Sequence, residues 1–237
     1  MKNICFLVCI LFVFRAGAQI PDKNVYLAEL RTELSAKWPA NRTINLVFHG
    51  HSVPSGYFKT PEVRTLFAYP QLVLRLLENR YPYAVINSIV TAIGGENSEQ
   101  GAKRFVDEAL NHRPDVLFID YALNDRGIGL ERALKSWEYM IETALSKGIK
   151  VILCTPTPDQ SVDILDDSSP LALHSTQIRK LAEKYSVGLA DFYLAFQERV
   201  RRGDAIGTYM SQVNHPNTIG HVVAAMEIAG WFVIDSE

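Results

Sequence analysis

Short apolar runs alternate with longer amphipathic segments over most of this chain, and this alternation limits the folds open to it. The apolar runs are rich in branched residues and cover residues 44–48, 84–90, 115–120, 150–154 and 187–191. Near-continuous apolarity of this length is typical of strands that are buried on both faces, as in a parallel sheet. The runs therefore predict five strands of one central sheet.

Five amphipathic segments lie between or after these runs, at residues 72–77, 102–110, 130–145, 171–185 and 222–229. Their apolar residues recur at the spacing of one helix face. Asn97 and Gln100 form the pattern of a capping box before the second segment, and Gly148 ends the third. Strands that alternate with helices in this way predict one α/β domain with a central parallel sheet and right-handed crossovers.

The amino-terminal segment has the pattern of a secretory signal peptide. Lys2 precedes a continuous apolar run over residues 4–14, and "RAGAQ" supplies an Ala-x-Ala cleavage site. The run is too short to span a bilayer, so an uncleaved anchor is the weaker alternative. We predict a signal peptide at residues 1–18, cleavage after Ala18 and one domain over residues 19–237. The mature protein is then secreted or periplasmic and inserts into no membrane.

Composition narrows the possible partners. The formal net charge is −2 and no basic stripe is visible, so neither nucleic acid nor an anionic membrane has electrostatic support as a partner. Cys154 is the single cysteine beyond the signal segment, so the mature chain has no internal disulfide and depends on its core for stability. A small molecule or a neutral polymer is the favoured partner, and the oligomeric state stays open.

Four polar positions follow the predicted strands or precede the last helix. Ser52 follows the first apolar run, Gly95 the second and Asn124 the third, while His215 lies in the predicted loop before the last helix. A doubly wound sheet places its site at the carboxyl ends of its strands. The four residues suit acyl transfer, because an imidazole can take the serine proton and N–H donors can stabilise the oxyanion.

The four segments resemble the conserved blocks of the SGNH (GDSL-like) hydrolases. Ser52 matches the family's nucleophile, Gly95 its oxyanion glycine, Asn124 its oxyanion asparagine, and His215 in "HPNTIGH" its base. The resemblance covers about residues 44–221. It implies a flavodoxin-like three-layer α/β/α sandwich with a central five-stranded parallel sheet. It also implies an oxyanion hole formed by Ser52, Gly95 and Asn124, and no cofactor is expected.

Three positions depart from the family's pattern. His51 stands where the family has an aspartate before the serine, and Ala122 stands where it has a glycine. Gln212 stands where the family has its acid, three residues before the base. A triad carboxylate holds the imidazole in its productive tautomer and stabilises the imidazolium, so the loss at position 212 bears directly on catalysis.

The group that orients His215 stays open among several alternatives. The side-chain carbonyl of Gln212 could accept the Nδ1 proton without bringing a charge, and a backbone carbonyl could do the same. A carboxylate from elsewhere is the third alternative, and the candidates by position are Asp120, Asp125, Asp204 and Glu96.

Each site residue also has a structural alternative. Ser52 and Gly95 could be turn residues, Asn124 could cap a helix, and His215 could bind a carbonyl. Asp125 is interpreted as structural, holding its loop. A zinc site is an alternative role for five of the histidines, but their spacing fits no usual zinc ligand set, so no metal is expected. These are His49, His51, His174, His215 and His221.

Taken together, the sequence predicts an exported serine esterase that hydrolyses short-chain acyl esters. O-acetyl groups on carbohydrates are the substrate that secreted relatives suggest. A lipid or thioester acylhydrolase with the same site is the nearest alternative. The alternative from another class is a non-catalytic carbohydrate-binding protein with a decayed triad, which Gln212 and His51 favour.

Overall fold

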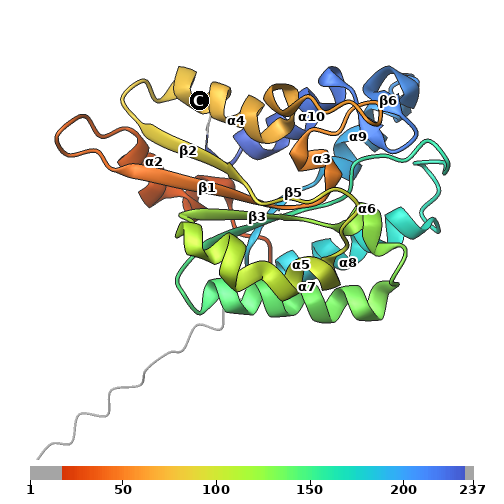
Figure 1. The fold of residues 1–237 in the computed structure, drawn as a ribbon, viewed down its shortest axis with the longest axis horizontal. Coiled ribbons are helices and arrows are strands. Elements are labelled where there is room, and N and C mark those ends of the chain that lie inside the picture. The colour runs from red at the N-terminus through yellow and green to blue at the C-terminus, as the bar shows by residue number, and fades with distance from the viewer. Residues whose placement is uncertain (1–17, 233–237) are drawn as a thin grey trace, which may run out of the picture.

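A five-stranded parallel sheet forms the middle layer of the computed structural model, which describes residues 18–232 (Figure 1). The strands are β1 (Thr43–Gly50), β2 (Val85–Val90), β3 (Val116–Asp120), β4 (Lys150–Cys154) and β5 (Gly188–Ala190). Their order, β2-β1-β3-β4-β5, is the flavodoxin-like order. The predicted α/β sandwich is therefore confirmed. Residues 1–17, which carry nearly all of the predicted signal peptide, lie outside the described residues.

Helices cover both faces of the sheet. Figure 1 shows α4, α9 and α10 on one side of it, and α5, α7 and α8 on the other. The helices are α1 (Lys23–Tyr26), α2 (Ala28–Leu34), α3 (Ser52–Ser55), α4 (Tyr69–Arg80), α5 (Ser98–Arg104), α6 (Ala122–Asp125), α7 (Leu130–Leu145), α8 (Pro170–Tyr185), α9 (Phe192–Arg201) and α10 (Thr218–Ala229). Single turns occur at Thr65–Phe67, Leu110–His112 and Ile206–Tyr209, and a π-helical turn at Phe105–Ala109.

All five predicted helices are present, but one is shorter and more irregular than the sequence suggests. The predicted helix at residues 102–110 starts earlier, at Ser98, and its regular part ends at Arg104 in a π-helical turn. The capping box of Asn97 and Gln100 at its start is confirmed. Helix α9 and the shorter helices α1, α2, α3 and α6 are not among the predicted ones. Helix α9 follows β5 directly, with the Asp191 side chain accepting from the backbone N–H of Leu194 at 3.1 Å.

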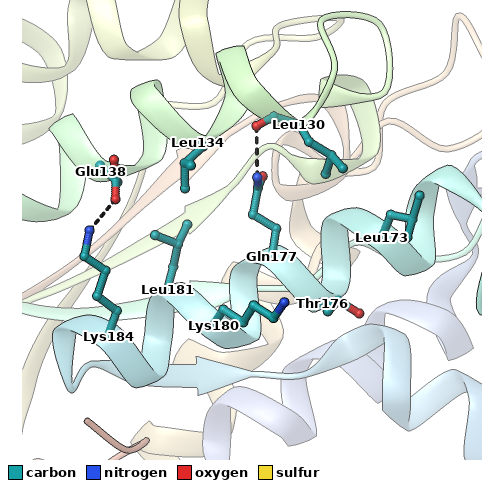
Figure 2. Close-up of a pocket in the computed structure, with 9 residues that line it drawn as sticks. All are labelled: Leu130, Leu134, Glu138, Leu173, Thr176, Gln177, Lys180, Leu181 and Lys184. Carbon is teal, nitrogen blue, oxygen red and sulfur yellow. Dashed lines mark hydrogen bonds and ion pairs between the residues drawn. The ribbon is translucent and has the colours of Figure 1, made fainter.

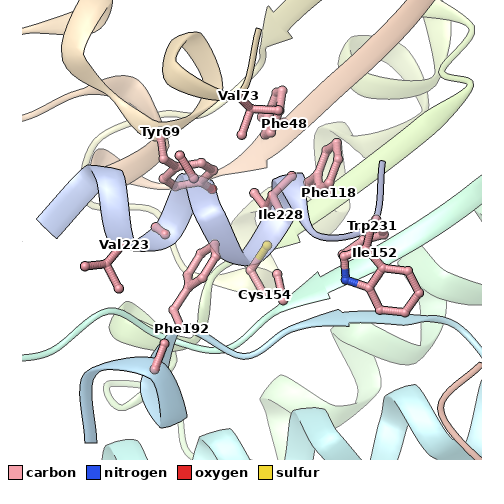
Figure 3. Packing of buried hydrophobic residues seen from close by; sticks show 14 of the residues in the cluster. Phe48, Tyr69, Val73, Phe118, Ile152, Cys154, Phe192, Val223, Ile228 and Trp231 are labelled. Atoms are coloured by element: carbon pink, nitrogen blue, oxygen red, sulfur yellow. The ribbon is translucent and has the colours of Figure 1, made fainter. Parts of the chain in front are cut away.

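The core lies in two layers, one on each face of the sheet. On the face covered by α4, α9 and α10, the rings of Phe48 and Phe118 stack with centroids 4.4 Å apart, and Tyr69 meets Phe48 edge to face (Figure 3). Cys154 is fully buried in the same layer, where burial raises the pKa of its thiol. This large aromatic cluster fixes the position of α4 and α10 over the sheet.

A short antiparallel pair, β6 (Met210–Gln212) and β7 (His215–Pro216), precedes α10. The sequence predicts a loop here, and this prediction is wrong in detail because His215 lies in a strand. Two- and three-residue strands carry too little periodicity to be recognised in a sequence. The hairpin matters because it fixes Gln212 and His215 relative to each other.

A buried carboxylate joins the segments that follow β2 and β3. The two oxygens of Asp125 accept from the backbone N–H of Ser98 at 2.7 Å and from the indole N–H of Trp137 at 2.7 Å. Asp125 is fully buried. It therefore holds the start of α5 and the face of α7 against the turn that carries Asn124, which agrees with the structural interpretation of this residue.

We expect Asp125→Ala to destabilise the protein because it leaves two buried N–H groups without an acceptor. Each unsatisfied donor costs about 1–3 kcal/mol, so the free energy of unfolding should fall by about 2–6 kcal/mol. Urea denaturation measures this loss. Asp107→Ala removes an exposed carboxylate and serves as the control. Equal stability of the two variants would contradict the role given to Asp125.

Candidate active site

Ser52 is presented at the carboxyl end of β1 by a sharp change from strand to helix. The strand ends at Gly50, and Ser52 is the first residue of the one-turn helix α3. A Cβ atom on Gly50 would lie 2.5 Å from the backbone oxygen of Asp120 and 2.9 Å from Cγ of Pro54. Glycine is therefore required here, since only its lack of a side chain lets α3 fold back onto the neighbouring strand.

Ser52 and His215 meet although they are far apart in the sequence. His215 Nε2 lies 2.9 Å from Ser52 Oγ, which is a normal hydrogen-bond distance. Both residues are buried, with exposed fractions of 7% for Ser52 and 6% for His215. The serine hydroxyl thus has an imidazole nitrogen in position to take its proton.

The second nitrogen of His215 lies between a backbone carbonyl and an amide. Nδ1 is 3.2 Å from the carbonyl oxygen of Phe58 and 2.7 Å from Nε2 of Gln212. The other end of the amide, Oε1, accepts from the backbone N–H of Thr60 at 2.9 Å. The Gln212 amide therefore turns its nitrogen, not its oxygen, towards the imidazole.

The hairpin is tied to the segment after α3, which keeps these groups in place. The hydroxyl of Ser211 lies 2.9 Å from the Phe58 carbonyl oxygen and 3.0 Å from that of His215. Burial lowers the pKa of His215, the hydrogen bond to the Phe58 carbonyl raises it, and electrostatic interaction with the nearby His51 lowers it. The net direction is downward, so the imidazole is held in its neutral form.

The four carboxylates proposed as partners of the base are engaged elsewhere. Within residues 18–232, none of them makes a hydrogen bond or ion pair with His215. Asp120 lies against His51, Asp204 accepts from the hydroxyl of Tyr209, and Glu96 pairs with Arg104. Asp125 accepts from the backbone N–H of Ser98 and the indole N–H of Trp137, as described above. In the described part of the chain, the His215 imidazole therefore has no carboxylate partner.

Gly95 and Asn124 lie on the two loops that follow β2 and β3. Gly95 has a φ of 82°, a left-handed conformation that favours glycine, and in residues 18–232 no protein acceptor faces its backbone N–H. The side-chain amide of Asn124 donates one hydrogen bond to the carbonyl of Glu96 at 2.7 Å. This bond links the two loops directly and leaves the second amide hydrogen of Asn124 available.

His51 is the residue at the site that the sequence left without a task. It is fully buried, and its Nδ1 lies 3.5 Å from Ser52 Oγ and 3.3 Å from the backbone nitrogen of Val53. Its Nε2 lies 3.3 Å from Oδ1 of Asp120. The signal was present in the sequence, since His51 precedes Ser52 directly, but its partner Asp120 comes from another strand. By contrast, His49 binds Thr91 and Gly101, away from Ser52.

One aromatic ring borders the two proposed catalytic residues. Tyr57 is half-buried, and its ring centroid lies 5.9 Å from that of His215. A Cβ atom on Gly94 would approach the Tyr57 ring to 2.8 Å, so the ring packs directly on the glycine loop after β2. Tyr57 therefore links the segment after α3 to the loop that carries Gly95.

A separate groove of about 470 Å³ lies between α7 and α8 and shares no residue with this site. Figure 2 shows Leu130, Leu173 and Leu181 along it, with Gln177 donating to the carbonyl of Leu130 at 2.9 Å. Among residues 18–232 there is no group of three or more histidine, cysteine or acidic side chains arranged to hold a metal ion. Nor does any helix of that segment combine the length and apolarity needed to cross a bilayer.

We expect His215 to titrate below the usual histidine pKa of about 6.5 in the folded protein. Burial disfavours the imidazolium, so the ring stays neutral until the pH falls below that value, and protonation then destabilises the fold. An NMR titration of the imidazole signals, assigned with His215→Ala, measures this. The urea-unfolded chain is the reference. A His215 pKa at or above that of the unfolded chain would contradict the described environment.

Solved structures with the same fold include several carbohydrate esterases. A two-domain esterase (CEX) active on acetylated mannans matches with a TM-score of 0.70 and 18% identity, covering 88% of this chain and 52% of that chain. This chain thus spans about half the length of that esterase. A catalytic mutant of Axe2, an acetylxylan esterase from Geobacillus stearothermophilus, matches with a TM-score of 0.67 and 19% identity, covering 80% and 94%. The acetyl xylan esterase AlAXEase matches at 0.64 and 24%, covering 78% and 98%.

These identities are low, so the likeness to solved structures concerns the fold. No curated protein sequence matches the chain significantly. A family model does match: the model of the GDSL-like lipase/acylhydrolase family covers residues 48–223. That segment runs from the end of β1 into α10 and contains all four blocks on which the resemblance was based. The chain therefore belongs to the GDSL-like lipase/acylhydrolase family.

Proposed function

We propose that this chain is an exported serine esterase that hydrolyses short acyl esters, with O-acetyl groups on carbohydrates as its substrate class. The observation that carries the proposal is the 2.9 Å distance between Ser52 Oγ and His215 Nε2 at the carboxyl edge of the sheet. The acetylated mannans and xylans named for the structural neighbours support the substrate class. The amino-terminal sequence pattern supports export.

The reaction follows from the positions of the two side chains. Ser52 Oγ attacks the ester carbonyl carbon while its proton passes to His215 Nε2. His215 then gives this proton to the leaving alcohol, and an acyl-enzyme remains. A water molecule, deprotonated by the same nitrogen, attacks the acyl-enzyme and releases the acid. The lowered pKa of His215 favours the neutral imidazole, which is the form that accepts the serine proton.

Three donors are assigned to the oxyanion: the backbone N–H groups of Ser52 and Gly95 and the side-chain amide of Asn124. Ser52 is the first residue of α3, so its N–H has no partner within the helix. His51 accepts from the next N–H, that of Val53, and does not occupy that of Ser52. The unpaired N–H of Gly95 and the second amide hydrogen of Asn124 support the other two assignments.

The Phe58 carbonyl is assigned as the group that keeps the Nδ1 proton on His215. A proton on Nδ1 leaves Nε2 free to accept from Ser52, as the mechanism requires. If the Gln212 amide nitrogen donated to Nδ1 instead, the proton would lie on Nε2 and the base would be lost. With the proton on Nδ1, the Gln212 N–H₂ group faces it donor to donor at 2.7 Å. Turning the amide around would present its oxygen to the Nδ1 proton but would set N–H₂ against the N–H of Thr60.

The native chain should react with a fluorophosphonate probe and release acetate from a chromogenic acetate ester. Ser52→Ala removes the attacking oxygen, so it should show neither reaction above background. Labelling is read by intact-protein mass spectrometry and turnover by absorbance. The esterase proposal fails if the native chain does neither, or if Ser52→Ala does both at the native rate.

Replacement of Gln212 by alanine should have a small effect, because the orienting acceptor is the Phe58 carbonyl. A neutral hydrogen bond is worth about 0.5–1.5 kcal/mol, so kcat/KM should fall by about tenfold or less. Loss of a triad group that sets the tautomer costs about 10⁴-fold. Gln160→Ala is the control, since the Gln160 side chain donates to the backbone carbonyl of Gln212 and makes no hydrogen bond with His215. A loss near 10⁴-fold in Gln212→Ala would make Gln212 the essential partner.

A further inference from the structure

A second imidazole nitrogen faces the nucleophile. Nδ1 of His51 lies 3.5 Å from Ser52 Oγ, against 2.9 Å for Nε2 of His215. In the resting site His215 is the hydrogen-bond acceptor of the serine hydroxyl, because its nitrogen is the nearer of the two. A small movement of one side chain would nevertheless bring His51 Nδ1 to normal hydrogen-bond distance from Ser52 Oγ. The His51 ring is completely buried beside Ser52.

The surroundings of His51 determine which of its nitrogens carries the proton. The backbone N–H of Val53 points at Nδ1 from 3.3 Å, so Nδ1 must be an acceptor. Nε2 faces Oδ1 of Asp120 at 3.3 Å, and a carboxylate oxygen requires a donor. Both atoms are buried, and among residues 18–232 neither makes a hydrogen bond, so their contact is one of ion-pair distance. The proton therefore lies on Nε2, and the lone pair of Nδ1 is turned towards the start of α3.

Asp120 is itself fixed in place. Its second oxygen accepts from the hydroxyl of Tyr69 at 2.9 Å, and the residue is 1% exposed. A buried carboxylate that carries a negative charge needs partners, and the donors that face it are Tyr69 and His51. In space, Asp120, His51 and Ser52 thus follow the order of carboxylate, imidazole and hydroxyl in a catalytic triad. Here Nδ1 faces the hydroxyl and Nε2 the carboxylate, the reverse of the usual triad.

We propose that His51 and Asp120 form a second general-base pair for Ser52, which supplies the charged carboxylate that position 212 lacks. This inference rests on the proposed nucleophilic role of Ser52. As the serine oxygen attacks, the Nδ1 lone pair of His51 leaves the Val53 N–H and takes the serine proton, and the carboxylate of Asp120 stabilises the imidazolium. The proton returns to Ser52 Oγ when the acyl group is released. Because His51 is completely buried, it does not deliver a proton to a leaving group in solvent, so this pair serves substrates whose leaving group departs as an anion. A leaving alcohol that must be protonated is served by His215.

A fluorophosphonate separates these two tasks, because fluoride leaves as an anion and needs no proton. In that reaction the Ser52 Oγ–P bond forms, the P–F bond breaks with its electron pair on fluoride, and the serine proton goes to the base. The test therefore uses the full mature chain with His215→Ala as the background, where His51 is the remaining imidazole at Ser52. Labelling rates are measured by intact-protein mass spectrometry.

Three further variants in this background make the test specific. His51→Asn keeps a side-chain oxygen that can cap α3 through the Val53 N–H but removes the link to Asp120. Asp120→Asn removes the charge and places an N–H₂ group or an uncharged oxygen against His51. His49→Asn is the matched control, since His49 is a buried histidine two residues before His51 that binds Thr91 and Gly101. Thermal unfolding of each variant reports its folding.

We expect His215→Ala to label about 10²–10⁴-fold more slowly than the native chain, the usual contribution of a general base. It should still label at least about tenfold faster than His215→Ala with His51→Asn, and the His49→Asn control should keep the faster rate. Equal rates with and without His51→Asn in folded proteins overturn the inference. If Asp120→Asn does not fold, the test depends on His51→Asn alone, which keeps an oxygen to cap α3. A native chain that does not label overturns the proposed function itself.

Discussion

The hydrogen bond between Ser52 and His215 joins two points of the chain that only the parallel sheet brings together. Strand β1 pairs with β2 on one side and with β3 on the other, so the segments that follow these three strands emerge at one edge. The hairpin of β6 and β7 reaches the same edge from the end of α9 and delivers His215 to Ser52. Because the sheet brings Ser52 and His215 together, the position of these residues also depends on the aromatic core that packs on the sheet and on the hydrogen bonds of Asp125.

Charge is distributed unusually around the serine. The imidazole that bonds to Ser52 has a backbone carbonyl and a neutral amide at its other nitrogen. The buried carboxylate at this edge, Asp120, lies instead behind His51. A buried neutral base with a lowered pKa needs no counter-charge in the resting protein, which explains how the fold tolerates Gln212. An imidazolium formed during catalysis does benefit from a negative charge, and one formed on His51 has the carboxylate of Asp120 beside it.

Much of this arrangement could be predicted from the sequence, and the remaining features could not be predicted for physical reasons. Continuous apolar runs mark strands buried on both faces, so all five strands were found, and β4 matched residue for residue. Ser52, Gly95 and Asn124 were singled out by their places after those runs, and His215 by its place before the last predicted helix. The short hairpin around His215 escaped because so few residues show no periodicity. The contacts of His51 with Asp120, and of His215 with Phe58, escaped because they join residues that only tertiary packing brings together.

A covalent acyl-enzyme on Ser52 is the direct mark of the proposed chemistry. The native chain can be mixed with a chromogenic acetate ester, quenched in acid during the first turnovers, digested and read by mass spectrometry. The peptide that contains Ser52 should then carry one acetyl group, which disappears as the ester is exhausted. Steady turnover with no acetyl group on that peptide, or with the acetyl group on another residue, would contradict catalysis by Ser52.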